Sequence, residues 1–250
     1  MNVFKNYSRY YNLLYKDKDY EGEAKYVMEL IKKFAPHTKS LLDLGCGTCK
    51  HDHYFINNGF SVTGVELSTE MIGIAKKEIC HKNLEIYQGD IRQIKLDKKF
   101  DSIVSLFHVI SYQTTNEDII NTFKTVKSHL NPNGIFIFDC WYGPTVITEK
   151  PECRIKQLED ENIKVTRICE PAIYPEKNTV DVNYKIHILN KTDNKTEEVK
   201  ETHKMRYYFT PELEFLLNST GLELIHSEKW ITGEKPDFNT FSVCFIAKNK

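Results

Sequence analysis

The chain has 250 residues, of which 40% are hydrophobic and 28% are charged, which suits a globular protein with one large domain or one domain carrying an insertion. The formal net charge of −1 gives no overall basic field of the kind that favours binding to nucleic acid. No apolar run approaches the ~20 residues that span a bilayer, and the N-terminus lacks the apolar core of a signal peptide. We therefore expect a cytoplasmic protein that binds neither nucleic acid nor membranes.

The first 145 residues alternate between amphipathic segments and short apolar runs. Helical spacing of apolar positions predicts four helices: 20–34, 50–58, 69–79 and 116–130. The apolar runs predict five strands: 40–45, 60–67, 84–90, 100–110 and 135–141. Strands that alternate with helices form βαβ units, so we expect a mostly parallel sheet covered on both faces.

The pattern changes after Pro144. Four runs of alternating polar and apolar residues, separated by turn-like segments, predict an antiparallel β-meander over 153–209. A predicted helix and a closing pair of strands follow: 210–221, 222–230 and 241–248. We therefore expect a Rossmann-like α/β domain built from 1–145 and 210–250 and closed by an antiparallel strand, with an antiparallel β cap over 146–209 that helps to select the substrate.

The ends of the first two predicted strands point to an adenosine-type ligand. Gly45 and Gly47 permit a tight turn and a close approach of the ligand to the backbone. Glu66 follows Gly47 by nineteen residues, near the spacing at which a carboxylate binds both ribose hydroxyls. A dinucleotide fingerprint would have a third glycine where Lys50 stands, and Asp43 would repel a pyrophosphate. Asp43 suits a ligand with an ammonium group, as in S-adenosylmethionine (SAM).

Four segments in order, "LLDLGCGT", "VTGVELSTEMIGIAK", "LEIYQGDIR" and "FDSIVSLFHVI", resemble the successive motifs of class I SAM-dependent methyltransferases. In that family the glycine loop holds the methionine part of SAM, and the acidic residue after the second strand binds the ribose. The "GD" carboxylate binds the adenine, and the residues after the fourth strand line the sulfonium. The resemblance implies these cofactor-binding residues: Asp43, Gly45, Gly47, Glu66, Leu67, Met71, Asp90, Ile91, Leu106 and Phe107.

A narrower resemblance covers nearly the whole chain. The segments "YSRYYNLLYKDKDYEGEA", "SLFHVISYQTT" and "DCWYGP", together with the late β-insertion, are similar to the sugar-nucleotide N,N-dimethyltransferases. The implied reaction methylates the amine of a dTDP-linked amino sugar and leaves S-adenosylhomocysteine. The resemblance also implies an N-terminal helical lid in which Tyr11 and Tyr15, four residues apart, contact SAM from one helical face. The alternative is that these tyrosines only pack on the sheet.

Other residues are assigned to the acceptor side of the site. His108 follows the fourth strand, and we interpret it as the catalytic base or orienting group because imidazole titrates near neutral pH. A locally packed histidine is the alternative. Trp141 and Tyr142 follow the fifth strand and could stack on a sugar or base, or could pack in the core. Arg154 and Arg206 in the cap could pair with a diphosphate, or could be solvated.

Two other functions remain open from the sequence. One is methylation of the oxygen or nitrogen of another small molecule. The other is a non-catalytic regulatory protein that binds SAM or a nucleotide. The sequence does not fix the oligomeric state, and a homodimer is compatible with it.

The stretch "CGTCKHDH" also permits a redox or zinc-binding interpretation. Cys46 and Cys49 are spaced like a redox pair, and His51 and His53 could complete a metal site. His51 and His53 are two residues apart, however, and point to different faces of a helix, so we predict no metal. Cys49 instead replaces a glycine that is usual in the methyltransferase family.

Overall fold

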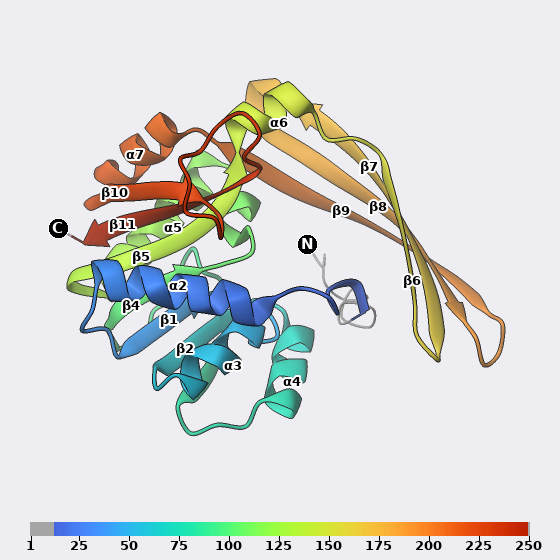
Figure 1. Ribbon diagram of the computed structural model, residues 1–250, viewed down its shortest axis with the longest axis horizontal. Coiled ribbons are helices and arrows are strands. Elements are labelled where there is room, and N and C mark those ends of the chain that lie inside the picture. Colours follow the sequence, from blue (N-terminus) through green and yellow to red (C-terminus); the bar gives the residue numbers. More distant parts are fainter. Residues whose placement is uncertain (1–12, 250) are drawn as a thin grey trace.

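The computed structural model describes residues 13–249 and contains a central sheet of seven strands, of which six run parallel and one, the second from one edge, runs antiparallel to the rest. The spatial order of these strands is β3 (Leu84–Gln88), β2 (Ser61–Glu66), β1 (Ser40–Leu44), β4 (Phe100–Ser105), β5 (Leu130–Tyr142), β11 (Ser242–Asn249) and β10 (Leu222–Lys229). This arrangement confirms the predicted Rossmann-like sheet with its antiparallel closing strand (Figure 1). Across the described residues, no helix is long and apolar enough to cross a membrane.

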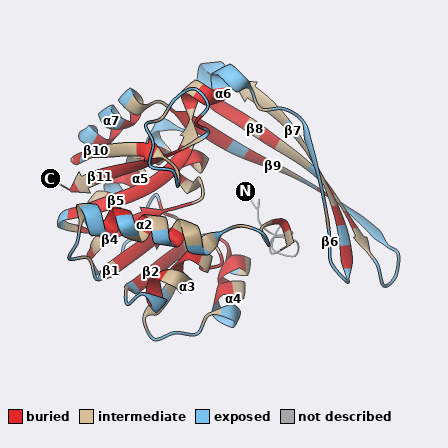
Figure 2. Cartoon of the chain, viewed as in Figure 1, coloured by how far each residue is buried: buried red, intermediate tan, exposed pale blue. Residues whose placement is uncertain are grey.

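Helices cover both faces of this sheet. The principal ones are α2 (Tyr20–Phe34), α3 (Lys50–Asn57), α4 (Thr69–Glu78), α5 (Asn116–His129) and α7 (Thr210–Ser219). Their N-termini follow the expected capping chemistry, because Asp19, Ser68 and Thr115 accept hydrogen bonds from the first turns of α2, α4 and α5. The apolar sides of α2 and α3 pack on one face of the sheet, and those of α5 and α7 on the other. The central strands between these helices are mostly buried, whereas the edge strands are partly exposed (Figure 2).

The β-rich insertion forms a four-stranded antiparallel sheet that extends away from the α/β domain (Figure 1). It follows α6 (Gly143–Glu149) and consists of β6 (Arg154–Glu159), β7 (Ile163–Tyr174), β8 (Thr179–Asn190) and β9 (Thr196–Tyr208), with a short 3-10 turn η2 (Pro175–Lys177). The end of β9 pairs in parallel with the last two residues of β5. We call the four strands the cap, and this pairing fixes the cap beside the carboxyl end of the main sheet.

Two predicted boundaries differ from the structure. The fourth strand was predicted over 100–110, but β4 ends at Ser105 and Val109–Tyr112 forms a 3-10 helix, η1. The segment "NPNG", residues 131–134, was expected to separate a helix from the fifth strand, but β5 already begins at Leu130. Asn133 has a left-handed φ of 63°, and the pairing with β4 shifts register between Phe100 and Ser102. The turn residues thus form an irregularity inside the strand without ending it.

Candidate active site

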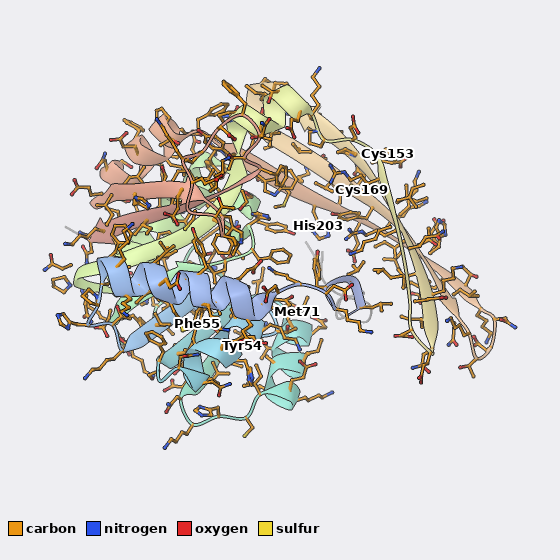
Figure 3. The ribbon with its side chains drawn as sticks, viewed as in Figure 1. Tyr54, Phe55, Met71, Cys153, Cys169 and His203 are labelled. Carbon is orange, nitrogen blue, oxygen red and sulfur yellow. The ribbon has the colours of Figure 1, made fainter. Side chains whose placement is uncertain are left out.

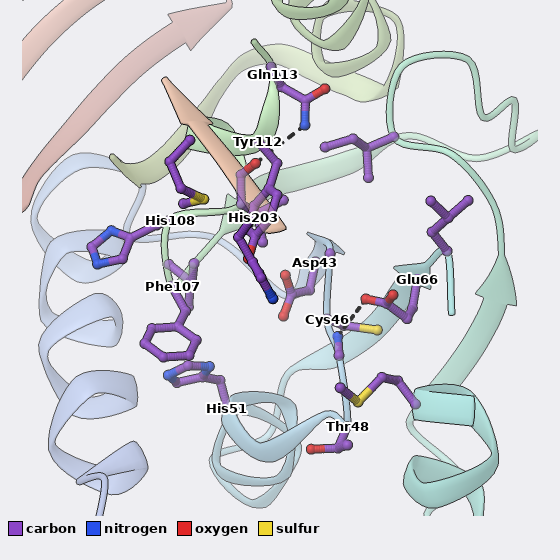
Figure 4. A pocket seen from close by; sticks show the side chains of 18 of the residues that line it. Asp43, Cys46, Thr48, His51, Glu66, Phe107, His108, Tyr112, Gln113 and His203 are labelled. Carbon is purple, nitrogen blue, oxygen red and sulfur yellow. Dashed lines mark hydrogen bonds between the residues drawn. The ribbon is translucent and has the colours of Figure 1, made fainter. Parts of the chain in front are cut away.

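A cavity of about 560 Å³ opens at the carboxyl ends of the parallel strands. Its walls come from the loops after β1, β2, β3 and β4, from the end of β5, and from the inner side of the cap (Figure 4). Thirteen of the residues selected from the sequence line it: Tyr15, Asp43, Gly45, Gly47, Glu66, Leu67, Met71, Asp90, Ile91, Leu106, Phe107, His108 and Trp141. Tyr11 lies outside the described residues. Segments far apart in the sequence therefore meet at one site, as expected for an open α/β sheet.

The glycine loop after β1 has the geometry of a ligand cradle. Gly45 has a φ of 89°, and a Cβ added there would lie 2.6 Å from the side chain of Val109, which follows β4. Only glycine allows these two loops to approach so closely. Gly47 has a φ of 56°, and an added Cβ would meet no atom within 4 Å, so its open side faces space in which a ligand can lie.

Glu66 is oriented by backbone donors of two loops. Its carboxylate accepts a hydrogen bond of 3.0 Å from the N–H of Gly47 and one of 2.8 Å from the N–H of Ser68. Burial raises the pKa of Glu66 above its ordinary value, although these backbone hydrogen bonds act in the opposite direction. A carboxylate held at the rim of β2 with remaining lone pairs is suited to accept hydrogen bonds from vicinal hydroxyls.

Asp43 presents an incompletely paired carboxyl group at the floor of the cavity. The residue is 2% exposed, and its Oδ1 atom has no hydrogen-bond partner. Burial raises the pKa of Asp43 well above its ordinary value, and the neighbouring carboxylates of Asp52 and Glu66 raise it further. A cationic group in the cavity would relieve this accumulation of negative charge.

Asp90 is already engaged by an arginine. The guanidinium of Arg92 contacts both carboxylate oxygens of Asp90 at 2.5–3.0 Å and also contacts Asp118 at 2.7 Å. The hydrogen bonds from Arg92 lower the pKa of Asp90. Arg92 therefore holds the carboxylate of Asp90 in place at the cavity wall. An amine of a bound ligand would hydrogen-bond to a carboxylate that already accepts from Arg92.

His108 is held in place by a buried carboxylate. Its Nδ1 lies 2.6 Å from Oδ2 of Asp139, and its backbone N–H donates to the same carboxylate. Burial by itself raises the pKa of Asp139, but His108 and the hydroxyl of Ser242 more than offset this, so the pKa is lowered. Because Nδ1 faces Asp139, Nε2 is the ring nitrogen that remains for an acceptor molecule.

Aromatic rings surround His108. Trp141 and Phe241 lie with ring centroids 6.4 Å and 6.2 Å from the imidazole, and they are 4.9 Å from each other. The ring of Phe107 lies 5.9 Å from the imidazole, and the ring of Tyr15 meets that of Phe107 edge to face at 5.1 Å. These rings make the cavity wall largely apolar around one oriented histidine, as in many small-molecule sites.

The cap contributes a second polar group. His203 extends from β9 toward the α/β domain (Figure 3), and its Nδ1 lies 2.7 Å from the hydroxyl of Tyr112. Its Nε2 lies 3.3 Å from a carboxylate oxygen of Glu201, so the tautomer that donates to Glu201 accepts from Tyr112. Burial and then nearby acidic groups raise the pKa of Tyr112 well above its ordinary value, which keeps it protonated. Tyr112 and His203 both line the cavity.

Three residues selected for the substrate do not line the cavity. Tyr142 packs against the core of the α/β domain. Arg154 is exposed on the edge strand of the cap. Arg206 is buried, and its guanidinium contacts Asn116 at 2.8 Å and Glu212 at 2.5 Å, which ties β9 to the starts of α5 and α7. Its position assigns Arg206 to the attachment of the cap.

We expect Arg206→Gln to destabilise the protein by about 3 kcal/mol, because removing one member of a buried ion pair leaves the other member unpaired. Denaturant unfolding measures this change, and Arg154→Gln, at an exposed position, should change stability by less than about 0.5 kcal/mol. If Arg206→Gln instead kept full stability and weakened only substrate binding, a direct role in the site would be restored.

Sequence reasoning missed several residues that line or support the cavity. Asp139 belongs to the segment "DCWYGP". A carboxylate near the carboxyl end of a buried strand indicates a role in the site, so its position could have identified it. Tyr112 belongs to the segment "SLFHVISYQTT" and His203 to no motif, and neither was selected because their pairing depends on how β9 crosses the cavity. Phe241 lies next to a closing strand, where an aromatic residue is unremarkable in sequence.

Cys49, which stands where the family usually has glycine, does not line the cavity. Cys49 is fully buried, does not line the cavity, and has a φ of 58° that glycine adopts without strain. We therefore expect Cys49→Gly to leave the affinity for SAM within about twofold by calorimetry. Gly47→Ala, at the open side of the loop, should weaken SAM binding about tenfold. A large loss of affinity in Cys49→Gly would show that the departure matters.

Comparison with known proteins agrees with this geometry. A family model described as a methyltransferase domain matches residues 41–134. The dTDP-3-amino-3,4,6-trideoxy-alpha-D-glucopyranose N,N-dimethyltransferase of Streptomyces venezuelae is 32% identical over 141 residues, 56% of this chain. The matched region spans 59% of that relative's length.

Two solved structures resemble nearly the whole fold. A SAM-dependent methyltransferase from Clostridium acetobutylicum has a TM-score of 0.83 at 21% identity and covers 99% of both chains. DesVI from Streptomyces venezuelae has a TM-score of 0.81 at 23% identity and covers 98% of both chains. These matches show that residues 41–134 match a methyltransferase domain and that the chain has the fold of class I SAM-dependent methyltransferases.

Proposed function

We propose that this protein transfers a methyl group from SAM to the amine of a nucleotide-linked amino sugar, of the dTDP-sugar type. The observation that carries the proposal is the oriented His108 in an aromatic-walled cavity next to the glycine loop. The Streptomyces venezuelae relative, named as an N,N-dimethyltransferase of a dTDP-amino sugar, supports the acceptor class. Since such sugars and SAM are intracellular metabolites, we also propose a cytoplasmic location.

The donor side of the cavity fits SAM. The open side of Gly47 leaves room for the ligand backbone, and the unpaired Oδ1 of Asp43 suits its ammonium group. Glu66 would accept from the ribose hydroxyls, and Leu67 and Ile91 line the same part of the cavity as apolar walls for the adenine. SAM supplies a methyl group activated by a positively charged sulfur.

The acceptor side provides the remaining requirements for methyl transfer. The reaction is an in-line displacement, so the enzyme gains rate by aligning the amine and excluding water. The rings of Phe107, Trp141 and Phe241 restrict the acceptor to one approach. Nε2 of His108 takes the proton that the amine loses, and Asp139 stabilises the resulting imidazolium. Tyr112, backed by His203, offers a second hydrogen bond to the sugar.

A turnover assay tests the proposal. The purified protein is incubated with SAM and with dTDP-3-amino and dTDP-4-amino sugars, and methylated product is identified by mass spectrometry. We expect transfer to the amine. Methylation of hydroxyl groups, or of amines without a nucleotide, would redirect the acceptor assignment. SAM binding without turnover on any of these acceptors would favour a regulatory role.

A further inference from the structure

A cluster of buried acidic and sulfur groups lies beneath the glycine loop and has no part in the proposed reaction. It consists of the thiols of Cys46 and Cys49 and the carboxylate of Asp52, and one ligand atom from each lies within 4.8 Å of the others. Cys49 and Asp52 are both 0% exposed. Cys46 also lines the cavity, so the cluster has a route to the cavity and to solvent.

Local backbone geometry brings these three residues together. The N–H of Cys49 donates to the carbonyl of Cys46 at 2.9 Å, which forms a turn that places both thiols on one side. The left-handed Cys49 then caps α3, and Asp52 occupies the inward side of its first turn, one turn before the buried Phe55. Gly64 on β2 leaves room for the cluster, because a Cβ there would lie 2.7 Å from Sγ of Cys46.

The two histidines of the same segment have other partners. Nε2 of His51 lies 2.7 Å from a carboxylate oxygen of Glu23. The ring of His53 lies 3.1 Å from the side-chain amide of Asn57. The residue between them, Asp52, is the one that faces the thiols.

The carboxylate of Asp52 is the observation that points to a ligand. The side chain is fully buried, its polar neighbours are the carboxyl of Asp43 and the thiol of Cys49, and no basic side chain among the described residues hydrogen-bonds to it. A buried carboxylate without a compensating partner is costly, and such groups are normally paired or bound to a cation. The cluster thus brings two thiols and the carboxyl groups of Asp43 and Asp52 together, and within the described part of the chain no lysine or arginine pairs with them.

We propose that Cys46, Cys49 and Asp52 bind a divalent transition-metal ion of the zinc type. Two thiolates and one carboxylate are ligands that Zn²⁺ accepts, with Zn–S distances of about 2.3 Å and Zn–O distances of about 2.0–2.2 Å. Because the three ligand atoms lie within 4.8 Å of one another, an ion placed between them would be at most about 2.8 Å from each. A movement of each ligand atom by about 0.5 Å toward the ion would bring these distances to the values usual for zinc. A water molecule on the cavity side takes the fourth position.

This site is distinct from methyl transfer and does not depend on the proposed function. The ion would connect the glycine loop to the first turn of α3, and the protons of both thiols would leave to solvent as it binds. The metal therefore has a structural role behind the donor loop, with Asp43 as the link between the ion and the ligand cavity.

The metal content of the purified chain tests the proposal. The protein is prepared without added chelator, dialysed against equimolar zinc, passed over a desalting column and analysed by elemental mass spectrometry. We expect about one zinc per chain in the parent protein and less than about 0.1 in Cys49→Gly and Asp52→Asn. Cys49→Gly suits the left-handed backbone, and Asp52→Asn preserves side-chain shape, so both variants are expected to fold.

Matched controls use thiols elsewhere in the chain. Cys80 is exposed, and Cys153 is exposed on the cap (Figure 3), so Cys80→Ser and Cys153→Ser should retain the zinc. Cobalt in place of zinc should give thiolate-to-metal absorption in the parent and in these controls, and should not in Cys49→Gly. Chelation should lower the thermal midpoint of the parent and leave that of Cys49→Gly unchanged.

Three results would overturn the proposal. The first is a parent protein that folds and holds no zinc after dialysis. The second is equal zinc content in the parent and in both site variants. The third is a Cys46–Cys49 disulfide, found by thiol titration and peptide mass mapping, in place of a metal in the folded chain. SAM affinity, measured on the same samples, decides separately whether the proposed methyltransferase function holds.

Discussion

Replacing Glu66 by glutamine is expected to weaken SAM binding about 100-fold, or roughly 2.7 kcal/mol. The carboxylate is fixed by the N–H groups of Gly47 and Ser68, so its remaining lone pairs meet the ribose hydroxyls without reorganisation. A glutamine amide places an N–H₂ group opposite one of these backbone donors or opposite the ribose. It therefore loses at least one charge-assisted hydrogen bond and misaligns the loop.

Isothermal titration with SAM and with S-adenosylhomocysteine measures the effect of Glu66→Gln. Glu85→Gln is the matched control, because Glu85 lies on the exposed side of β3 and pairs with Lys98 outside the cavity. It should leave both affinities within about twofold. If Glu66→Gln bound both ligands as tightly as the parent protein, Glu66 would have no role in the site, and the adenosine orientation proposed here would be wrong.

The sequence predicted the α/β sheet and the donor side of the cavity well, because short segments of the chain encode these features. Alternating strands and helices, a glycine loop and carboxylates at strand ends are encoded within short segments, and parallel strands must bring those ends together. The mostly parallel sheet with its antiparallel closing strand was therefore predicted, although the order of its strands was not, and the donor-side residues from Asp43 to Asp90 all line one cavity.

The acceptor side could not be predicted in the same way. The pairing of Tyr112 with His203 joins two residues 91 positions apart, and it depends on the course of β9 across the cavity. Arg206 was assigned to the substrate because the sequence shows its positive charge. The sequence does not show that this charge is paired with Glu212 in the folded chain. A solvated arginine was the stated alternative, and the structure shows a third outcome, a buried ion pair between the cap and α7.

The stretch "CGTCKHDH" shows the same distinction at close range. Helical geometry correctly separates His51 from His53, but it also turns Asp52 inward, toward the thiols. The two cysteines of this stretch do lie together, but the histidines do not join them. The third side chain close to the thiols is that of Asp52. Residue types alone do not show which of these side chains lie together, whereas the direction of each side chain on the helix does.

Replacing His108 by asparagine is expected to lower kcat for methyl transfer about 100-fold, the usual contribution of a general base, while the affinity for SAM stays within about twofold. The imidazole is held by Asp139 at 2.6 Å and is enclosed by Trp141 and Phe241, so asparagine keeps a polar group there but cannot accept the amine's proton. Steady-state kinetics with a saturating acceptor, together with calorimetry for SAM, separates the two quantities.

Two further variants sharpen this test. His53→Asn, at an exposed histidine of α3, should leave kcat unchanged. Asp139→Asn should lower kcat about tenfold, because it removes the charge that stabilises the protonated His108. The pKa of Asp139 is held below its ordinary value, so Asp139 supports the folded site at all pH values above about 4 and loses this effect only as the pH falls through its own lowered pKa.

Tyr112→Phe decides between the two polar groups of the acceptor side. If His108 is the base, this change removes only a hydrogen bond to the sugar and should raise KM by about fivefold with little effect on kcat. If Tyr112→Phe abolished turnover while His108→Asn kept it, the proton would leave through Tyr112 and His203, with Glu201 in the place that Asp139 holds here. The cap would then supply part of the catalytic machinery as well as substrate selectivity, and the site would be complete only with β9 in place.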